Sequence, residues 1–166
     1  MRVLGIDPGS RITGLGIVSA NGDELTCVYK GEVKMAKASL AERLKCIYAG
    51  VFEAVKHYQP DVVAIEKVFM AKNANSALVL GHARGAAICA AVNAGLMVGE
   101  YSALQIKQAV VGTGAADKNQ VQHMVRVLLG LTSKPPSDAA DALACAICHI
   151  NTSRITQKLA LQGYVQ

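Results

Sequence analysis

The first third of the chain is a series of short apolar runs separated by turn signals. One run covers residues 3–6 and ends at Asp7-Pro8-Gly9, and a second run covers residues 13–18. After Asn21-Gly22, a strong signal for a two-residue hairpin, apolar and polar positions alternate over residues 25–35. This pattern predicts three strands, at 3–6, 13–18 and 25–35, joined as an antiparallel meander.

Beyond the meander, the spacing of apolar residues changes to that of helices. Between Leu40 and Val55 they fall on one helical face, Ser39 with Glu42 forms a capping box, and Pro60 follows the end. Helical and strand patterns alternate from there. The predicted elements are a helix over 40–55, strands at 62–65 and 96–98, and helices over 75–92, 102–110, 117–129 and 137–150.

A meander followed by alternating helices and strands is typical of an α/β domain with a mixed sheet. We therefore expect one domain over residues 1–150, with a mixed five-stranded sheet flanked by helices. Residues 151–166 are weakly patterned and are expected to form a tail with little order. The length of 166 residues fits one domain, and a hydrophobic fraction of 52% excludes a disordered chain.

The sequence offers no membrane or export signal. The most apolar stretch, residues 86–98, is too short to span a bilayer, and the N-terminal apolar run stops at Asp7. The five cysteines are scattered and have apolar neighbours, which favours reduced thiols in the core over a disulfide framework. We therefore expect a cytoplasmic protein without membrane contact.

Four carboxylates occupy positions that matter for chemistry. Asp7 and Glu66 each end an apolar strand, and Asp138 and Asp141 share a face at the start of the last helix. Taken singly, each has a structural explanation: a turn before Pro-Gly, a solvated strand end, or the positive end of a helix dipole. Asp141 is the hardest to explain in this way, because alanine and leucine surround it.

Taken together, the four acids indicate a metal site. Carboxylates that meet in one cleft repel each other, so they take up protons or bind cations, and oxygen ligands select Mg²⁺ or Mn²⁺. Two such ions can promote displacement at a phosphodiester. The net charge is +5, and without these four acids the 17 basic residues face eight acidic ones, a charge of +9. A basic body around an acidic site suits a nuclease.

At this point the sequence resembles a known family along essentially its whole length. The resemblance is carried by Gly5-Ile6-Asp7-Pro8-Gly9, Ala64-Ile65-Glu66, Val68-Phe69 and the block at residues 135–142. In their order and spacing these motifs are similar to those of the bacterial Holliday junction resolvases of the RuvC family. The resemblance implies a ribonuclease H-like fold, a homodimer, and an endonuclease that nicks two opposed strands of a four-way DNA junction symmetrically, in recombination and repair.

The resemblance also implies the cofactor and the roles of the acids. Asp7, Glu66, Asp138 and Asp141 match the family's metal-binding catalytic acids. They would hold two Mg²⁺ ions per active site, with Mn²⁺ as a substitute. Water would attack the scissile phosphate in line and leave 5′-phosphate and 3′-hydroxyl ends. The family's partner complex is the RuvA–RuvB branch-migration motor.

Further residues match family positions that contact DNA. Phe69 matches an aromatic residue that stacks on an unpaired base, and Lys107 and Lys118 match lysines near the scissile strand. Lys72 and Asn73 lie in a variable loop that could read sequence. Each has a structural alternative: Phe69 as a small apolar staple, and the lysines as solvated helix residues.

The resemblance further implies that two subunits pair through the helix over 75–92. The spacing of Gly81 and Gly85 in this helix would allow a second helix to approach closely. Packing of the same glycines on the chain's own sheet is an equally good explanation.

Two motifs compete with this interpretation. Cys145-Ala-Ile-Cys148-His149 matches a haem-attachment pattern but lies within a predicted helix, where two core thiols are the simpler explanation. Residues 112–119 resemble a phosphate-binding loop, but Asp117 occupies the position of its last glycine and would repel phosphate.

Two other functions also remain open. A catalytically silent junction-binding module would share the fold but lack metal-dependent cutting. A nucleotide-dependent enzyme of the kinase and actin type would share the Asp-x-Gly turn, but it needs a second large domain.

Overall fold

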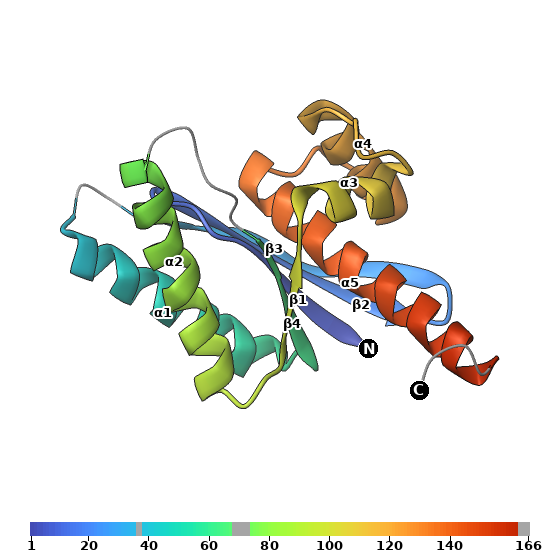
Figure 1. Ribbon diagram of the computed structural model, residues 1–166, viewed down its shortest axis with the longest axis horizontal. Helices are drawn as coiled ribbons and strands as arrows, with labels where there is room; N and C mark the ends of the chain where they lie inside the picture. Colours follow the sequence, from blue (N-terminus) through green and yellow to red (C-terminus); the bar gives the residue numbers. More distant parts are fainter. Residues whose placement is uncertain (36–37, 68–73, 163–166) are drawn as a thin grey trace.

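A five-stranded sheet with helices on both faces forms the framework of the molecule (Figure 1). The structure is a computed structural model, and it describes residues 1–35, 38–67 and 74–162. The strands are β1 (Arg2–Asp7), β2 (Ile12–Asn21), β3 (Glu24–Lys34), β4 (Val62–Glu66) and β5 (Val98–Tyr101). The helices are α1 (Leu40–Tyr58), α2 (Ala74–Asn93), α3 (Ala103–Val111), α4 (Lys118–Leu128) and α5 (Ser137–Leu161).

The strands lie in the order β3-β2-β1-β4-β5. β1 pairs antiparallel with β2, and β2 pairs antiparallel with β3, so the predicted meander is confirmed. β1 pairs parallel with β4, and β4 pairs parallel with β5. The predicted mixed five-stranded sheet is therefore confirmed, and its parallel part brings the carboxyl ends of β1 and β4 to one edge.

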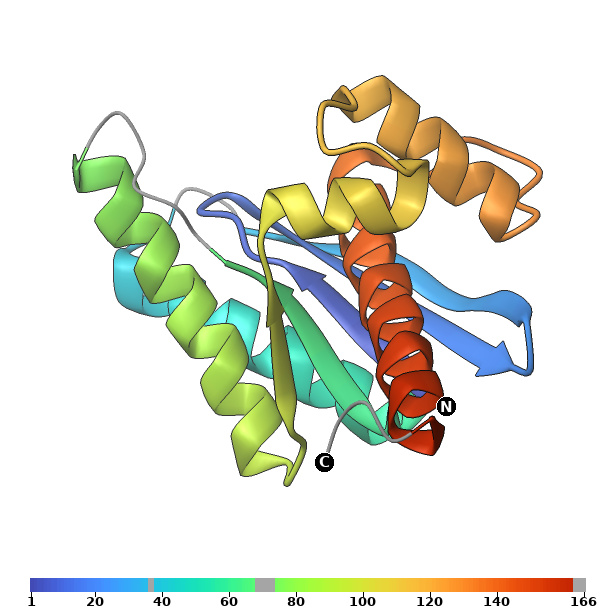
Figure 2. The same cartoon turned by 45° about the vertical axis from the view of Figure 1, so that its right-hand side comes forward.

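Alternate residues of the central strands face two separate cores. On β4, Val62 and Ala64 face the core that α3, α4 and α5 cover, while Val63 and Ile65 face α1 and α2. Figures 1 and 2 show α5 crossing one face of the sheet, with α1 and α2 on the other. Because both faces are covered, the central strands are continuous apolar runs, which is why they are visible in the sequence.

α5 lies directly on the backbone of β1 and β2. A Cβ at Gly5 would clash with the carbonyl oxygen of Ala142, and one at Gly14 would clash with the carbonyl oxygen of Asp138. The glycines therefore let the helix backbone touch the sheet, as glycine does where two backbones approach closely. This contact fixes the height of the first turns of α5 above the sheet.

Three helices begin with capping boxes, and the predicted box of Ser39 with Glu42 is one of them. In each, the cap side chain accepts a hydrogen bond from the backbone N–H three residues on, and that residue's side chain accepts one from the cap backbone. The pairs are Ser39 with Glu42, Ser102 with Gln105, and Asp117 with Gln120. The caps fix these helix starts locally, so the sequence alone reveals them.

The predicted strand at 96–98 is displaced: β5 runs from Val98 to Tyr101. Gly95 has a φ of 80°, and the backbone N–H of Leu96 donates to the carbonyl of Ala91 at 3.1 Å. This hydrogen bond closes the C-terminus of α2, as in a Schellman motif. Leu96 therefore belongs to the helix cap, and the strand begins after it.

The prediction that the last helix ends near Ile150 is wrong, because α5 continues to Leu161. Polar side chains hold this extension: Asn151 donates to the carbonyl of Ala109 at 3.1 Å, and the guanidinium of Arg154 donates to the carbonyl of Gly22. Such bonds leave no apolar periodicity in the sequence. The expected tail of little order is thus wrong for residues 151–161, and residues 163–166 lie outside the described part.

All five cysteines are free thiols. Cys145 and Cys148 are buried in α5 as predicted, but Cys46 and Cys89 are exposed on the outer faces of α1 and α2, so the prediction of core cysteines is wrong for these two. In the part of the chain that the structure describes, no helix is long and apolar enough to cross a membrane.

Candidate active site

Asp7 and Glu66 lie next to each other at the carboxyl ends of two parallel strands. The register pairs Ile6 with Ile65, so the two acids are the next residues on their strands. Just beyond Asp7, the buried hydroxyl of Thr13 accepts a hydrogen bond from the N–H of Gly9 at 3.4 Å and donates to its carbonyl at 3.3 Å. This pair of bonds closes the turn that follows Asp7.

The other two acids come from the first turns of α5, above the same edge of the sheet. The contact of Gly14 with the backbone of Asp138 sets the height of this helix start. The segment that leads into α5 is held by Gln122, a buried side chain of α4. Its Nε2 donates a hydrogen bond to the carbonyl of Pro135 at 2.7 Å. Asp138 and Asp141 therefore face Asp7 and Glu66 from the opposite layer.

The charges of the other three acids act on Asp7. Burial, followed by the charges of Asp141, Glu66 and Asp138, raises the pKa of Asp7 from 3.8 to about 7. Burial and the charge of Asp141 also raise the pKa of Glu66. Negative charges from both sheet edge and helix start thus act on Asp7, as carboxylates near one cleft do.

Lys118 supplies a positive charge to this acidic cluster. Its ammonium lies 2.7 Å from Oδ2 of Asp141, and this hydrogen bond raises the pKa of Lys118. Glu66, Lys107, Lys118 and Asp141 line a pocket of about 200 Å³. The charges of Lys118 and Lys107 act against burial on the pKa of Glu66. Both sequence-predicted lysines thus lie at the acids.

The donor set fits a hard divalent cation, since all four candidate ligands are carboxylates. Burial and the neighbouring negative charges raise the pKa values of Asp7 and Glu66, and a bound cation would offset both effects. Among the described residues, no three His, Cys, Asp or Glu side chains are gathered closely enough to hold an ion as they stand. In this arrangement Oδ2 of Asp141 is paired with the ammonium of Lys118 at 2.7 Å.

Comparison with known proteins identifies the family. The family model described as crossover junction endodeoxyribonuclease RuvC matches residues 3–149. The crossover junction endodeoxyribonuclease RuvC of Aliivibrio fischeri is 60% identical over 158 residues, which cover 95% of this chain and 91% of that protein. The chain belongs to the RuvC family.

Solved structures of this family have the same fold. The structure of Thermus thermophilus RuvC superposes with a TM-score of 0.86 at 38% identity, covering 94% of this chain and 97% of that one. The same protein in complex with a Holliday junction substrate gives a TM-score of 0.89, also at 38% identity, covering 94% and 96%. The expected ribonuclease H-like fold of RuvC is confirmed.

Three predicted DNA-contacting residues, Phe69, Lys72 and Asn73, lie outside the described residues. The positioning roles of Thr13 and Gln122 are not apparent from the sequence of this RuvC family member. Thr13 could be suspected as a polar residue within an apolar run. Gln122 gives no such signal, because its burial depends on how α4 meets the Pro135-Pro136 turn.

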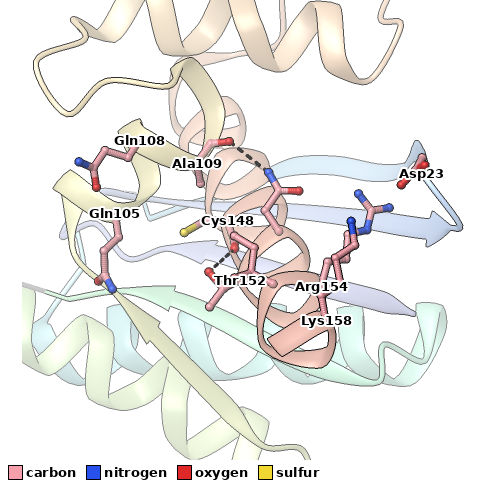
Figure 3. A pocket seen from close by; sticks show the side chains of 10 residues that line it. Asp23, Gln105, Gln108, Ala109, Cys148, Thr152, Arg154 and Lys158 are labelled. Atoms are coloured by element: carbon pink, nitrogen blue, oxygen red, sulfur yellow. Dashed lines mark hydrogen bonds between the residues drawn. The ribbon is translucent and has the colours of Figure 1, made fainter. Parts of the chain in front are cut away.

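Figure 3 shows a larger pocket, of about 590 Å³. It is lined from α3, α5 and the β2–β3 hairpin, and among its lining residues are Asp23, Gln108, Arg154 and Lys158. Among the described residues that line it, Asp23 is the one acid, and none of the four candidate acids is among them. The smaller pocket, by contrast, is lined by Glu66 and Asp141.

The haem-attachment pattern in α5 has a structural explanation. Burial raises the pKa of Cys145 well above its usual value and that of Cys148 to about 11, so both thiols stay protonated. His149 is engaged through Nδ1 with the hydroxyl of Tyr101 at 2.9 Å. The simpler explanation, two core thiols, is confirmed.

The loop that resembles a phosphate-binding site also has a structural role. Asp117 is the N-cap of α4, and its carboxylate accepts a hydrogen bond from the N–H of Gln120 at 2.9 Å. The carboxylate thus occupies the helix end at which a phosphate would bind.

Proposed function

We propose that this RuvC family member is a metal-dependent endonuclease that resolves four-way DNA junctions by paired, symmetric nicks in recombination and repair. The observation that carries the proposal is the meeting of four carboxylates at the ends of β1 and β4 beneath the start of α5. Its support from relatives is the RuvC family match over residues 3–149.

In this proposal Asp7, Glu66, Asp138 and Asp141 hold two Mg²⁺ ions, for which Mn²⁺ can substitute. The charges of the other three acids all act on Asp7, which suits a shared ligand. The chemistry that the bound ions supply is activation of water and neutralisation of charge on the phosphate. The products are 5′-phosphate and 3′-hydroxyl ends, without a covalent enzyme intermediate.

Lys118 and Lys107 would bind the scissile phosphate. Lys118 holds Asp141 by a charged hydrogen bond at 2.7 Å, and it is free to move because its side chain is 59% exposed. If Asp141 held a cation, the ammonium of Lys118 would be available to contact a phosphate oxygen. A positive charge at that position orients the strand and stabilises developing negative charge.

Further DNA contacts are proposed for Phe69, Lys72 and Asn73. Phe69 would stack on an unpaired base at the junction, since an aromatic ring can replace a base neighbour in the stack. Lys72 and Asn73, close by in sequence, would contact the strand beside it. Substitution of Phe69 by Ala tests this role through junction opening, followed with a fluorescent base.

The active form in this proposal is a homodimer that pairs through α2. Leu78, Gly81, Gly85, Cys89 and Val92 recur at the spacing of a helix–helix seam. Nothing lies within 4 Å of a Cβ built at Gly81 or Gly85, so packing on the chain's own sheet does not occupy them. Leu78 and Val92 on the same seam are exposed.

We further infer that the protein works in the cytoplasm with the RuvA–RuvB branch-migration complex. The five free thiols suit a reducing compartment. The RuvA–RuvB assignment rests on the family resemblance, and binding of this chain to a junction preassembled with RuvA would test it.

The deciding experiment is cleavage of a synthetic four-way junction with Mg²⁺, with the cuts mapped on all four strands. The proposal expects paired symmetric nicks from the natural protein and from Asp23→Asn, which alters an exposed acid in the hairpin. Asp141→Asn should bind the junction but leave it uncut. Tight binding without metal-dependent nicks would instead identify a silent junction-binding module.

A further inference from the structure

The backbone carbonyl of Glu66 lacks a donor in the sheet. The N–H of Lys67 donates to the carbonyl of Tyr101 on β5 at 2.7 Å. In a trans peptide the carbonyl of Glu66 points the opposite way, toward β1. If the register of the Ile6–Ile65 pair is continued, the residue whose N–H would face this carbonyl is Pro8, just after β1. Proline has no N–H, so this hydrogen bond cannot form.

Arg84 of α2 supplies this missing donor. Its Nε donates to the carbonyl of Glu66 at 3.2 Å, and its terminal nitrogen pairs with the carboxylate of Glu100 on β5. The Arg84 side chain is 22% exposed, so water competes weakly for it. One planar fork thus ties α2 to the ends of two strands, whereas the ammonium of a lysine lacks the fixed geometry that reaches both acceptors at once.

This contact reaches Glu66 from the side of the sheet opposite to its carboxylate. Glu100 pairs in register with Ile65, whose side chain belongs to the core beneath α1 and α2. The Glu66 side chain faces the other way, into the pocket with Lys118 and Asp141. Arg84 therefore fixes the backbone of the acid without entering the pocket.

We propose that Arg84 is a positioning residue for Glu66 and that Glu100 holds Arg84 in place. Glu66 is the last residue of β4, so the orientation of its carboxylate depends on how this strand end is held. The inference rests on the proposed role of Glu66 as a metal ligand. Partners that orient a ligand from behind contribute about 10-fold to 100-fold to metal affinity or activity.

The test compares Arg84→Lys with Arg154→Lys. Arg154 also donates to a backbone carbonyl, that of Gly22, but in the β2–β3 hairpin. For Arg84→Lys we expect a higher Mg²⁺ concentration for half-maximal cutting and a single-turnover rate about 10-fold to 100-fold lower. Junction affinity in EDTA and the thermal midpoint should match those of Arg154→Lys, because neither reports the orientation of a metal ligand.

Two further variants make each result decisive. Glu100→Gln keeps an acceptor for Arg84 but removes the ion pair, so it should raise the half-maximal Mg²⁺ concentration by a smaller factor. It decides the question if Arg84→Lys does not fold. An unchanged Mg²⁺ requirement in the folded variants would overturn the positioning role while Glu66→Gln remains inactive. Full activity of Glu66→Gln would instead overturn the proposed function itself.

Discussion

At the scale of single residues, burial and the charges of the neighbouring acids raise the pKa of Asp7. Its pKa is about 7 in the folded protein, against an ordinary value of 3.8. Between these two pH values the folded chain keeps a proton that the unfolded chain has released. Folding stability without metal therefore falls as the pH rises through this window.

We predict that Asp7→Asn stabilises the metal-free protein at pH 8 and has little effect at pH 4. The gain is at most about 4 kcal/mol, the free energy that corresponds to a pKa change from 3.8 to about 7. Urea unfolding in EDTA at both pH values measures it. Mg²⁺ at pH 8 should stabilise the natural protein more than the variant, and equal stabilisation would argue against Asp7 as a ligand.

A second residue-level prediction concerns the Lys118–Asp141 ion pair. Lys118→Gln should slow single-turnover cutting at least about tenfold, because the phosphate loses a positive partner in the pocket. Stability should change by no more than about 1 kcal/mol, since the pair is partly exposed. Lys158→Gln, at the far end of α5, is the matched control, and equal rates for the two variants would exclude this role.

At the scale of elements, the backbone contact of α5 with the β1–β2 pair decides where Asp138 and Asp141 lie. We predict that Gly14→Ala displaces the start of α5, because the new methyl group clashes with the carbonyl of Asp138. Destabilisation of about 1–3 kcal/mol and loss of cutting by the folded fraction should follow, measured by urea unfolding and junction cleavage.

The control for Gly14→Ala is Val51→Ala, which opens a cavity under α1 on the opposite face of the sheet. It should cost about 2 kcal/mol or more but leave cutting by the folded protein close to the natural rate. If both variants lose stability and neither loses cutting, the glycine contact does not position the acids.

The elements also differ in how far the sequence reveals them. Helices with capping boxes, such as the one that Ser39 begins, and buried strands are set by local patterns, so they could be predicted. The start of β5 could not, because it depends on the hydrogen bond of Leu96 to α2. The extension of α5 could not either, since Arg154 and Asn151 hold it through tertiary contacts.

The candidate site divides in the same way. The acids could be singled out because strand ends and helix starts are visible in the sequence. The pairing of Lys118 with Asp141, the hold of Gln122 on Pro135 and the bond of Arg84 to Glu66 could not be predicted. Each joins elements whose approach is decided only when both cores have packed.

At the scale of the whole molecule, the seam along α2 predicts the oligomeric state. Leu78→Asp should convert the proposed dimer to a monomer, because a charge would be buried without a partner where the two helices would meet. Val127→Asp, on α4, is the control: Val127 is 54% exposed and Leu78 63%. Sedimentation at micromolar concentration measures both, and a dimeric Leu78→Asp would place the interface elsewhere.

The seating of α5 on the glycines also has a consequence for the order of events in folding. The meander forms from neighbouring stretches of chain, whereas α5 follows every strand in the sequence and must return to β1 and β2. A chain emerging from the ribosome therefore presents all five strands before Asp138 and Asp141 can reach Asp7. The four acids can meet only once α5 has been made, so the proposed metal site is completed late in synthesis.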